Sequence, residues 1–345
     1  MSVKRLLIVA NRLPVHIDES SHFQASSGGL ASAMRGLDKS YAIQWIGWPG
    51  RVPRDSCHEQ EIRSKLAAIN TTPVFLSQEE IDGFYNGFAN ATLWPLFHYM
   101  SQQACFTEGW FDAYRNANQH FADVICEMAE YGEMVWVHDY HLMLLPAMLR
   151  KKRPDLRIGF FLHIPFPSYE LFRIIPERQQ LIEGLLGADM IGFHTFSYLR
   201  HFRSTLLHLC NIESLPGSAF YEGRNLHLGV YPIGHNKADF DAAQKTPAFA
   251  QHFQSLQEEF AGQKLVLSVE RLDYTKGIPQ KLKAIEHFLT QHPDQSDQVV
   301  FLILAVPSRQ GVEAYRDLTG KVQLQISQIN GRFSSFSRQP VHFFH

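Results

Sequence analysis

The chain carries KLVLSVERLDYTKG at residues 264–277, an apolar run followed at once by two fixed cations. The first half, KLVLSVE, is typical of a buried strand, and Arg271 and Lys276 lie just beyond it. Open α/β sheets bind ligands at the carboxyl ends of their strands. Arg271 offers a planar fork of donors and Lys276 a compact charge, so the pair suits a diphosphate. Because surface cations are more often simply solvated, this interpretation depends on the rest of the chain.

Strand-like and helical patterns alternate along most of the chain. The strand-like runs lie at 5–11, 42–48, 133–139, 157–164, 189–194 and 228–234. They are almost continuously apolar, as parallel strands buried on both faces are. Helical spacing appears between them, for example at 121–132 and 141–154. This alternation predicts a doubly wound α/β fold.

A polar stretch at 236–263 separates two such series. We therefore predict an N-terminal Rossmann-like domain at 1–240 and the first part of a second one at 241–345. The second series supplies about three strands, where a nucleotide-binding sheet usually has about six. We expect the second domain to be incomplete in this chain.

Composition narrows the classes of partner. The chain has 345 residues and a net charge of -2, which gives no support for nucleic acid as a partner. No run approaches the ~18 apolar residues of a membrane helix, and the apolar part of the N-terminus is too short for a signal peptide. Cys57, Cys105, Cys126 and Cys210 form no CxxC, which fits reduced thiols. We expect a cytoplasmic protein without a membrane partner.

Polar side chains close several of the predicted strands. Arg12 follows the first run, Asp139 and His163 close two later ones, and Arg309 follows a strand of the second series. Because the carboxyl ends of parallel strands meet at one edge of a sheet, we expect such groups to converge on a crevice. Each residue alone would have an ordinary structural explanation.

The glycine pair Gly28 and Gly29, in SSGGL, precedes a predicted helix. It is either a simple turn or a place where backbone N–H groups approach a phosphate. The pattern is not GxGxxG, so a nicotinamide dinucleotide receives little support.

The sequence HDYH places His138 and His141 on either side of Asp139. A metal site would be the basis of a metal hydrolase, but the HExxH spacing of helical zinc sites is absent. We favour Asp139 and His163 as hydrogen-bonding partners of a sugar, and no metal. His194 is interpreted as structural.

An aromatic segment spans residues 85–99 and contains Tyr85 and Trp94. We interpret it as a loop or short helix. It is either part of a core or a lid over a sugar, in which Trp94 supplies a flat apolar surface and Tyr85 a hydroxyl.

Taken together, these motifs closely resemble the trehalose-6-phosphate synthase family, over about residues 5–345. The motifs are VANR, SSGGL, WIGW, FYNGFANATLWPLFHY, VWVHDYHL, IGFFLHIPFP, VYPIG, SVERLDYTKG and INGRFS. The family consists of retaining glycosyltransferases of glycosyltransferase family 20, with two facing Rossmann-like domains in the GT-B arrangement. The resemblance implies transfer of glucose from UDP-glucose, or another NDP-glucose, to glucose 6-phosphate, with no cofactor.

The resemblance also implies roles for individual residues. Arg12 and Arg309 would hold the acceptor phosphate, with Tyr85 and Trp94 lining the acceptor pocket. The donor diphosphate would lie beside Gly28, Gly29, Arg271 and Lys276, and Asp139 and His163 would bind glucose hydroxyls. The departing diphosphate would accept the proton of the attacking hydroxyl, so Asp139, His163, Arg271 and Lys276 would be the catalytic residues.

Two departures from the family pattern stand out. His235 and Asn236 follow VYPIG, where the family usually has Ile and an acidic residue. The family's ribose-binding motif of the second domain is absent, so we expect weak activity or none from this chain.

Two alternatives stay open: a glucosylglycerol-phosphate synthase using ADP-glucose and glycerol 3-phosphate, and a non-catalytic sugar-phosphate-binding remnant. Homo-oligomer formation is also left open.

Overall fold

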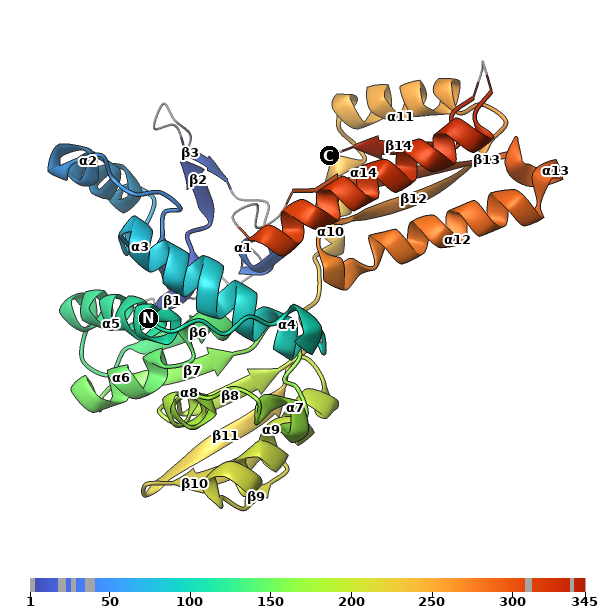
Figure 1. The fold of residues 1–345 in the computed structure, drawn as a ribbon. Coiled ribbons are helices and arrows are strands. Elements are labelled where there is room, and N and C mark those ends of the chain that lie inside the picture. Colours follow the sequence, from blue (N-terminus) through green and yellow to red (C-terminus); the bar gives the residue numbers. More distant parts are fainter. Residues whose placement is uncertain are drawn as a thin grey trace. The chain divides into compact units, whose positions relative to one another are not determined.

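The computed structural model describes residues 4–17, 23–25, 29–34, 41–307, 312–335 and 338–344. The chain divides into two compact units, Met1–His235 and Asn236–His345. The elements of both units are labelled in Figure 1.

Unit 1 is built on a large sheet with the strand order β5-β4-β1-β6-β7-β8-β11-β10-β9. Its strands are β1 (Lys4–Arg12), β4 (Tyr41–Trp48), β5 (Thr71–Pro73), β6 (Met134–His138), β7 (Arg157–Phe161), β8 (Met190–Phe193), β9 (Ser214–Leu215), β10 (Ser218–Tyr221) and β11 (Arg224–Val230). Pairing is parallel from β5 to β11 and antiparallel in β11-β10-β9. Strand β1 lies inside the sheet, with β4 and then β5 on one side and β6, β7 and β8 on the other. The predicted doubly wound topology is confirmed, and the order reverses between β1 and β6.

Strand β1 shows why the sequence folds this way. Its residues from Leu6 to Asn11 are all buried, on both faces of the sheet. Leu6, Ile8 and Ala10 pack with Ile62 and Leu66 in one core cluster. The continuously apolar run therefore marks a central parallel strand, as the sequence predicts.

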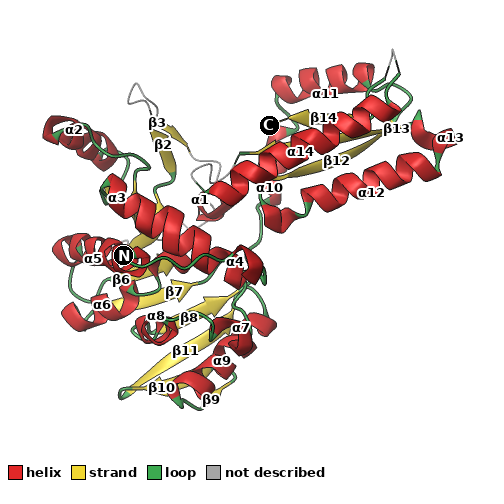
Figure 2. Cartoon of the chain, in the orientation of Figure 1, coloured by secondary structure: helices red, strands yellow, loops and turns green. Residues whose placement is uncertain are grey.

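Helices flank this sheet, as Figure 2 shows. They are α1 (Gly29–Met34), α2 (Ser56–Ala67), α3 (Gln78–Glu80), α4 (Trp94–Phe97), α5 (Trp110–Met128), α6 (Leu145–Lys152), α7 (Tyr169–Phe172), α8 (Arg178–Leu185) and α9 (Phe196–Cys210). Short 3-10 turns are η2 (Ser101–Gln103) and η3 (Tyr140–Leu142), and a hairpin is formed by β2 (Val15–Ile17) and β3 (Phe23–Ala25).

The aromatic segment is helical, which is one of the two conformations predicted for it. Ile81–Leu93 forms a π-helix, η1, that continues from α3 and runs into α4. Phe84, Phe88 and Trp94 are buried, so the segment is a packed helix, in agreement with the interpretation as part of a core, and its role over a sugar stays a prediction. A side chain on Gly87 would overlap the ring of Trp110, which explains how η1 packs so closely on α5.

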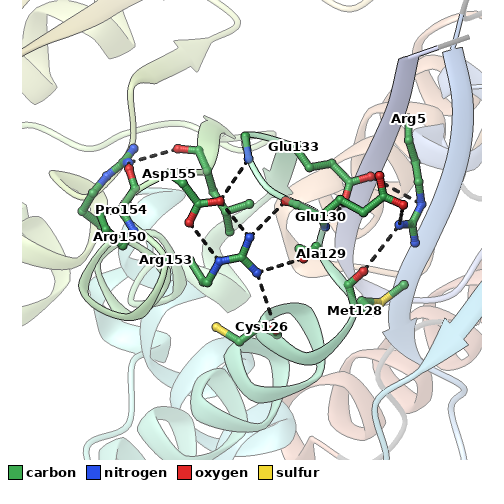
Figure 3. A network of polar contacts seen from close by, with 12 residues as sticks. Arg5, Cys126, Met128, Ala129, Glu130, Glu133, Arg150, Arg153, Pro154 and Asp155 are labelled. Atoms are coloured by element: carbon green, nitrogen blue, oxygen red, sulfur yellow. Dashed lines mark hydrogen bonds and ion pairs between the residues drawn. The ribbon is translucent and has the colours of Figure 1, made fainter. Parts of the chain in front are cut away.

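Ion pairs and hydrogen bonds tie elements together at the amino ends of the strands (Figure 3). Arg153 donates to the carbonyls of Ala129 and Glu130, where α5 ends, and pairs with Asp155 at 2.7 Å. Arg5, near the start of β1, pairs with Glu133 at 3.4 Å, just before β6. These contacts lie at the edge of the sheet opposite to Arg12, Asp139 and His163.

Unit 2 contains the parallel strands β12 (Lys264–Arg271), β13 (Val299–Val306) and β14 (Val341–Phe344), in that order. Its helices are α10 (Lys237–Ala243), α11 (Pro247–Glu259), α12 (Ile278–Gln291), α13 (Pro293–Ser296) and α14 (Glu313–Phe333), with a 3-10 turn η4 (Tyr274–Lys276). Helices α12 and α14 share a core with one face of the sheet, around Ile303 and Val341.

The prediction that the 264–270 run is buried is wrong for this structure. Leu265, Leu267 and Val269 are 41%, 59% and 65% exposed. Within the described residues, β12 pairs with β13 alone and therefore lies at the edge of its sheet. Among those residues, no helix combines the length and apolar character needed to cross a membrane.

Candidate functional site

The polar residues of unit 1 meet where the strand order reverses. Arg12 ends β1, His138 and Asp139 end β6, and His163 follows β7. Since β1, β6 and β7 are neighbours, their carboxyl ends lie along one edge. The convergence predicted from the sequence is confirmed for these residues. Ligands of doubly wound sheets bind at such a reversal point.

Arg12 is held by an aromatic side chain from the neighbouring strand. Its guanidinium carbon lies 4.6 Å from the ring centroid of Trp48, and Trp48 lies 5.7 Å from the ring of Tyr85. Gly50, with φ +88°, makes room, because a Cβ there would come within 2.4 Å of Arg12 Nη2. Sequence reasoning did not single out Trp48, although the WIGW motif contains it.

A chain of ring contacts joins Tyr85 to Trp94. Tyr85 stacks on His141 with centroids 5.8 Å apart, and His141 contacts Tyr140 at 4.0 Å. Tyr140 in turn lies 5.7 Å from Trp94 and donates a 2.7 Å hydrogen bond to Asn90 Oδ1. The structure therefore brings the predicted acceptor residues Arg12, Tyr85 and Trp94 into one cluster.

Helix α5 holds the backbone of this cluster through hydrogen bonds from its side chains. The buried Tyr114 hydroxyl donates to the carbonyl of Tyr140 at 2.7 Å and accepts from the N–H of Met143 at 3.0 Å. Asn118 Nδ2 donates to the carbonyl of His141 at 3.0 Å. Burial raises the pKa of Tyr114, which stays a neutral donor. Sequence reasoning missed these supports because they lie more than twenty residues from the segment they hold.

Asp139 has an unusual backbone. Its φ and ψ are 75° and 169°, a region that almost only glycine adopts, at a cost of about 1–3 kcal/mol. Its N–H donates to the carbonyl of Phe161 at 2.8 Å, and its Oδ1 accepts the N–H of His163 at 3.1 Å. Strain of this kind occurs at functional sites, and here it aims the carboxylate at the end of β7.

Three histidines lie side by side at this edge. His138 Nδ1 is 3.0 Å from His163 Nε2, and the rings of His163 and His194 are 5.7 Å apart. Burial lowers the pKa of His163 to about 4, and it also lowers the pKa values of His138 and His194. The rings are therefore neutral at physiological pH. His138 contacts His163, and His141 stacks on Tyr85.

The cations of unit 2 lie in a loop anchored by a buried carboxylate. Arg271 ends β12, Lys276 ends η4, and both are exposed immediately before the N-terminus of α12. The fully buried Asp273 accepts from the backbone and hydroxyl of Thr275 and from the hydroxyl of Tyr315 at 3.1 Å. Two cations beside a helix N-terminus are chemically suited to an anion, and Arg271 Nη2 also lies 3.8 Å from Asp273 Oδ2.

Two predicted site residues, Gly28 and Arg309, lie outside the described residues. Gly29 is the first residue of α1 and is exposed.

The parallel sheets and their polar carboxyl edges define a doubly wound α/β protein, a class whose members bind ligands at those edges. The family model for glycosyltransferase family 20 matches residues 4–345. The chain belongs to this family, and its fold class is GT-B, with two Rossmann-like domains.

Named relatives agree with this assignment. The chain is 46% identical to alpha,alpha-trehalose-phosphate synthase (UDP-forming) 2 of Aspergillus niger, over 99% of this chain and 73% of that protein. It is similar to the N-terminal domain of Candida albicans trehalose-6-phosphate phosphatase, with a TM-score of 0.87 and 30% identity, covering 100% of this chain and 72% of the other. It is also similar to the crystal structure of the Burkholderia xenovorans alpha,alpha-trehalose-phosphate synthase (UDP-forming) in complex with glucose-6-phosphate. The TM-score is 0.84 and the sequence identity is 28%, and the match covers 99% of this chain and 74% of the other.

Proposed function

We propose that this chain is an α,α-trehalose-phosphate synthase that transfers glucose from UDP-glucose to glucose 6-phosphate with retention of configuration. The names of its relatives support this proposal. The observation that carries it in the structure is the cluster of Arg12, Trp48, Tyr85 and Trp94 at the reversal point of unit 1. The cluster combines one fixed cation with flat aromatic faces, which suits a sugar phosphate.

In the proposed reaction, unit 1 binds the acceptor. Arg12 pairs with the phosphate, and its contact with Trp48 fixes the guanidinium plane before the ligand arrives. Tyr85 and Trp94 contact the sugar ring, while Asp139 and the neutral His163 bind hydroxyl groups.

Unit 2 is proposed to bind the donor diphosphate through Arg271 and Lys276. Negative charge grows on the diphosphate as the bond to glucose breaks. Cations already placed there stabilise this charge more in the transition state than in the ground state. The departing oxygen then accepts the proton of the attacking hydroxyl on the same face of the sugar.

We also propose a cytoplasmic location. The four cysteines, Cys57, Cys105, Cys126 and Cys210, are free thiols, as expected in a reducing compartment.

The test is release of UDP from UDP-glucose, with and without glucose 6-phosphate, for the wild type, Arg271→Ala and Lys283→Ala. Each lost charge-assisted hydrogen bond contributes about 1.5–3 kcal/mol, so Arg271→Ala should lower kcat by about 10–150-fold. Lys283→Ala removes an exposed cation from α12 and should retain wild-type activity. Equal activity in all three would refute the assigned donor site.

The similarity to a phosphatase N-terminal domain favours a second candidate, a sugar-phosphate-binding domain without transfer activity. Fold alone does not separate the two. Calorimetry showing glucose 6-phosphate binding, with no UDP release, would establish the second candidate. Release that requires ADP-glucose and glycerol 3-phosphate would instead identify a glucosylglycerol-phosphate synthase.

A further inference from the structure

His138 is fully buried beside the candidate site and contacts it through one ring nitrogen. Its Nδ1 lies 3.0 Å from His163 Nε2, while its ring packs at 4.6 Å from the ring of Trp136. The other nitrogen, Nε2, has no hydrogen-bond partner among the described residues. His138, His163 and Trp136 also line a cavity of about 370 Å³ whose walls are mostly apolar.

The distance between the two rings limits where their protons lie. At 3.0 Å, one nitrogen must donate and the other accept. Because burial lowers the pKa of both histidines, each ring is neutral and carries a single N–H. A proton on His138 Nε2 would be a buried donor without a described partner, which is rarer and more costly than a buried acceptor without one. The proton of His138 therefore belongs on Nδ1.

We infer that His138 is a positioning residue that donates from Nδ1 to His163 Nε2 and thereby fixes His163 as the Nδ1–H tautomer. The backbone of His163 is held separately by Asp139 Oδ1 at 3.1 Å. The ring is also bordered by Phe161 and His194, at 4.8 and 5.7 Å. With its Nε2 occupied, His163 presents one ring donor, Nδ1–H. What this donor contacts, a hydroxyl oxygen of glucose, rests on the proposed function.

Two substitutions separate the ring of His138 from its hydrogen bond. His138→Phe keeps a flat ring between Trp136 and the cavity but removes the donor. His138→Asn places an amide N–H close to the position of Nδ1 and should preserve the bond. His208→Phe replaces an exposed histidine of α9 and serves as the control.

The first readout is long-range ¹H–¹⁵N NMR of the histidine-labelled chain without ligand. Wild type should show His163 protonated at Nδ1, with scalar coupling across the N–H···N bond to His138. The coupling should vanish in His138→Phe, whereas His163 should remain the Nδ1–H tautomer in His138→Asn and His208→Phe. A wild-type His163 that is protonated at Nε2, or that exchanges between tautomers, would overturn the inference.

The second readout is UDP release. One hydrogen bond of ordinary strength corresponds to about a tenfold change in rate, so kcat should fall about tenfold in His138→Phe and recover in His138→Asn. Equal losses in both variants would contradict a role through the hydrogen bond. If the wild type releases no UDP, the proposed function fails, while the NMR result still decides the tautomer.

Discussion

The guanidinium of Arg12 lies against the Trp48 ring only because residue 50 lacks a side chain. A Cβ at Gly50 would come within 2.4 Å of Arg12 Nη2. We predict that Gly50→Ala displaces Arg12 and raises KM for glucose 6-phosphate by about 10–150-fold, the value of a lost charge-assisted contact. Gly132→Ala is the matched control, because its φ of +71° is also left-handed but an added Cβ would meet no atom of the described, non-adjacent residues within 4 Å. A similar rise in KM for both variants would show that backbone strain alone is responsible.

The buried histidines make stability depend on pH. His163 has a pKa of about 4 in the folded chain and His138 one well below its ordinary value, whereas both should titrate near 6.5 when unfolded. Between these values the unfolded state binds more protons, so stability falls as pH falls from about 6.5 towards 4. The slope is roughly 1.4 kcal/mol per pH unit for each histidine.

Urea unfolding at pH 7, 6 and 5 measures this loss. His138→Phe removes one of the buried groups and should show a smaller decline than the wild type. An equal loss of unfolding free energy in the two proteins would mean that His138 does not contribute to the pH dependence of stability.

At the scale of the element, the π-helix η1 depends on its glycines. A Cβ on Gly87 would lie 2.6–2.8 Å from ring atoms of Trp110. We predict that Gly87→Ala destabilises the fold by about 1–3 kcal/mol through overpacking, and that KM for glucose 6-phosphate rises because η1 carries Tyr85. Gly320→Ala, in α14 with open space around it, should be neutral or stabilising by about 0.5–1 kcal/mol. Denaturation midpoints of the two variants check the difference.

Strand prediction succeeded where burial is determined locally. The apolar runs at 5–11 and 42–48 became β1 and β4, since central parallel strands need apolar residues on both faces. For η1 the prediction allowed a loop or a short helix but did not indicate a π-helix, which lacks the 3.6-residue spacing and has no sequence signal of its own. It also missed Trp48, whose role depends on a contact with a residue 36 positions earlier in the chain.

At the scale of the whole molecule, the candidate site and a network of stabilising contacts lie at opposite edges of the unit 1 sheet. Arg153 ties the end of α5 to Asp155 at the amino edge, far along the strands from Arg12 and His163. We predict that Arg153→Ala lowers the melting temperature, since each hydrogen bond lost contributes about 0.5–1.5 kcal/mol, while kcat and KM stay unchanged. Arg316→Ala, an exposed arginine of α14, should leave both properties unchanged. A drop in kcat for Arg153→Ala would show that the edges are coupled.

The sequence patterns predicted the doubly wound topology and the meeting of Arg12, Asp139 and His163, because parallel order alone brings strand ends together. They did not predict the exposure of β12. An apolar run indicates a strand, but whether that strand is covered depends on neighbours elsewhere in the chain. The roles of the individual site residues stay predictions.

At position 139, stability and function favour different residues. Glycine would relieve the left-handed strain and should raise stability, but it would remove the carboxylate that holds His163. A library screened for heat resistance alone should therefore enrich glycine at position 139, and a library screened for product should discard it. In a selected population, glycine at position 139 would therefore indicate selection for stability, and aspartate would indicate selection for activity.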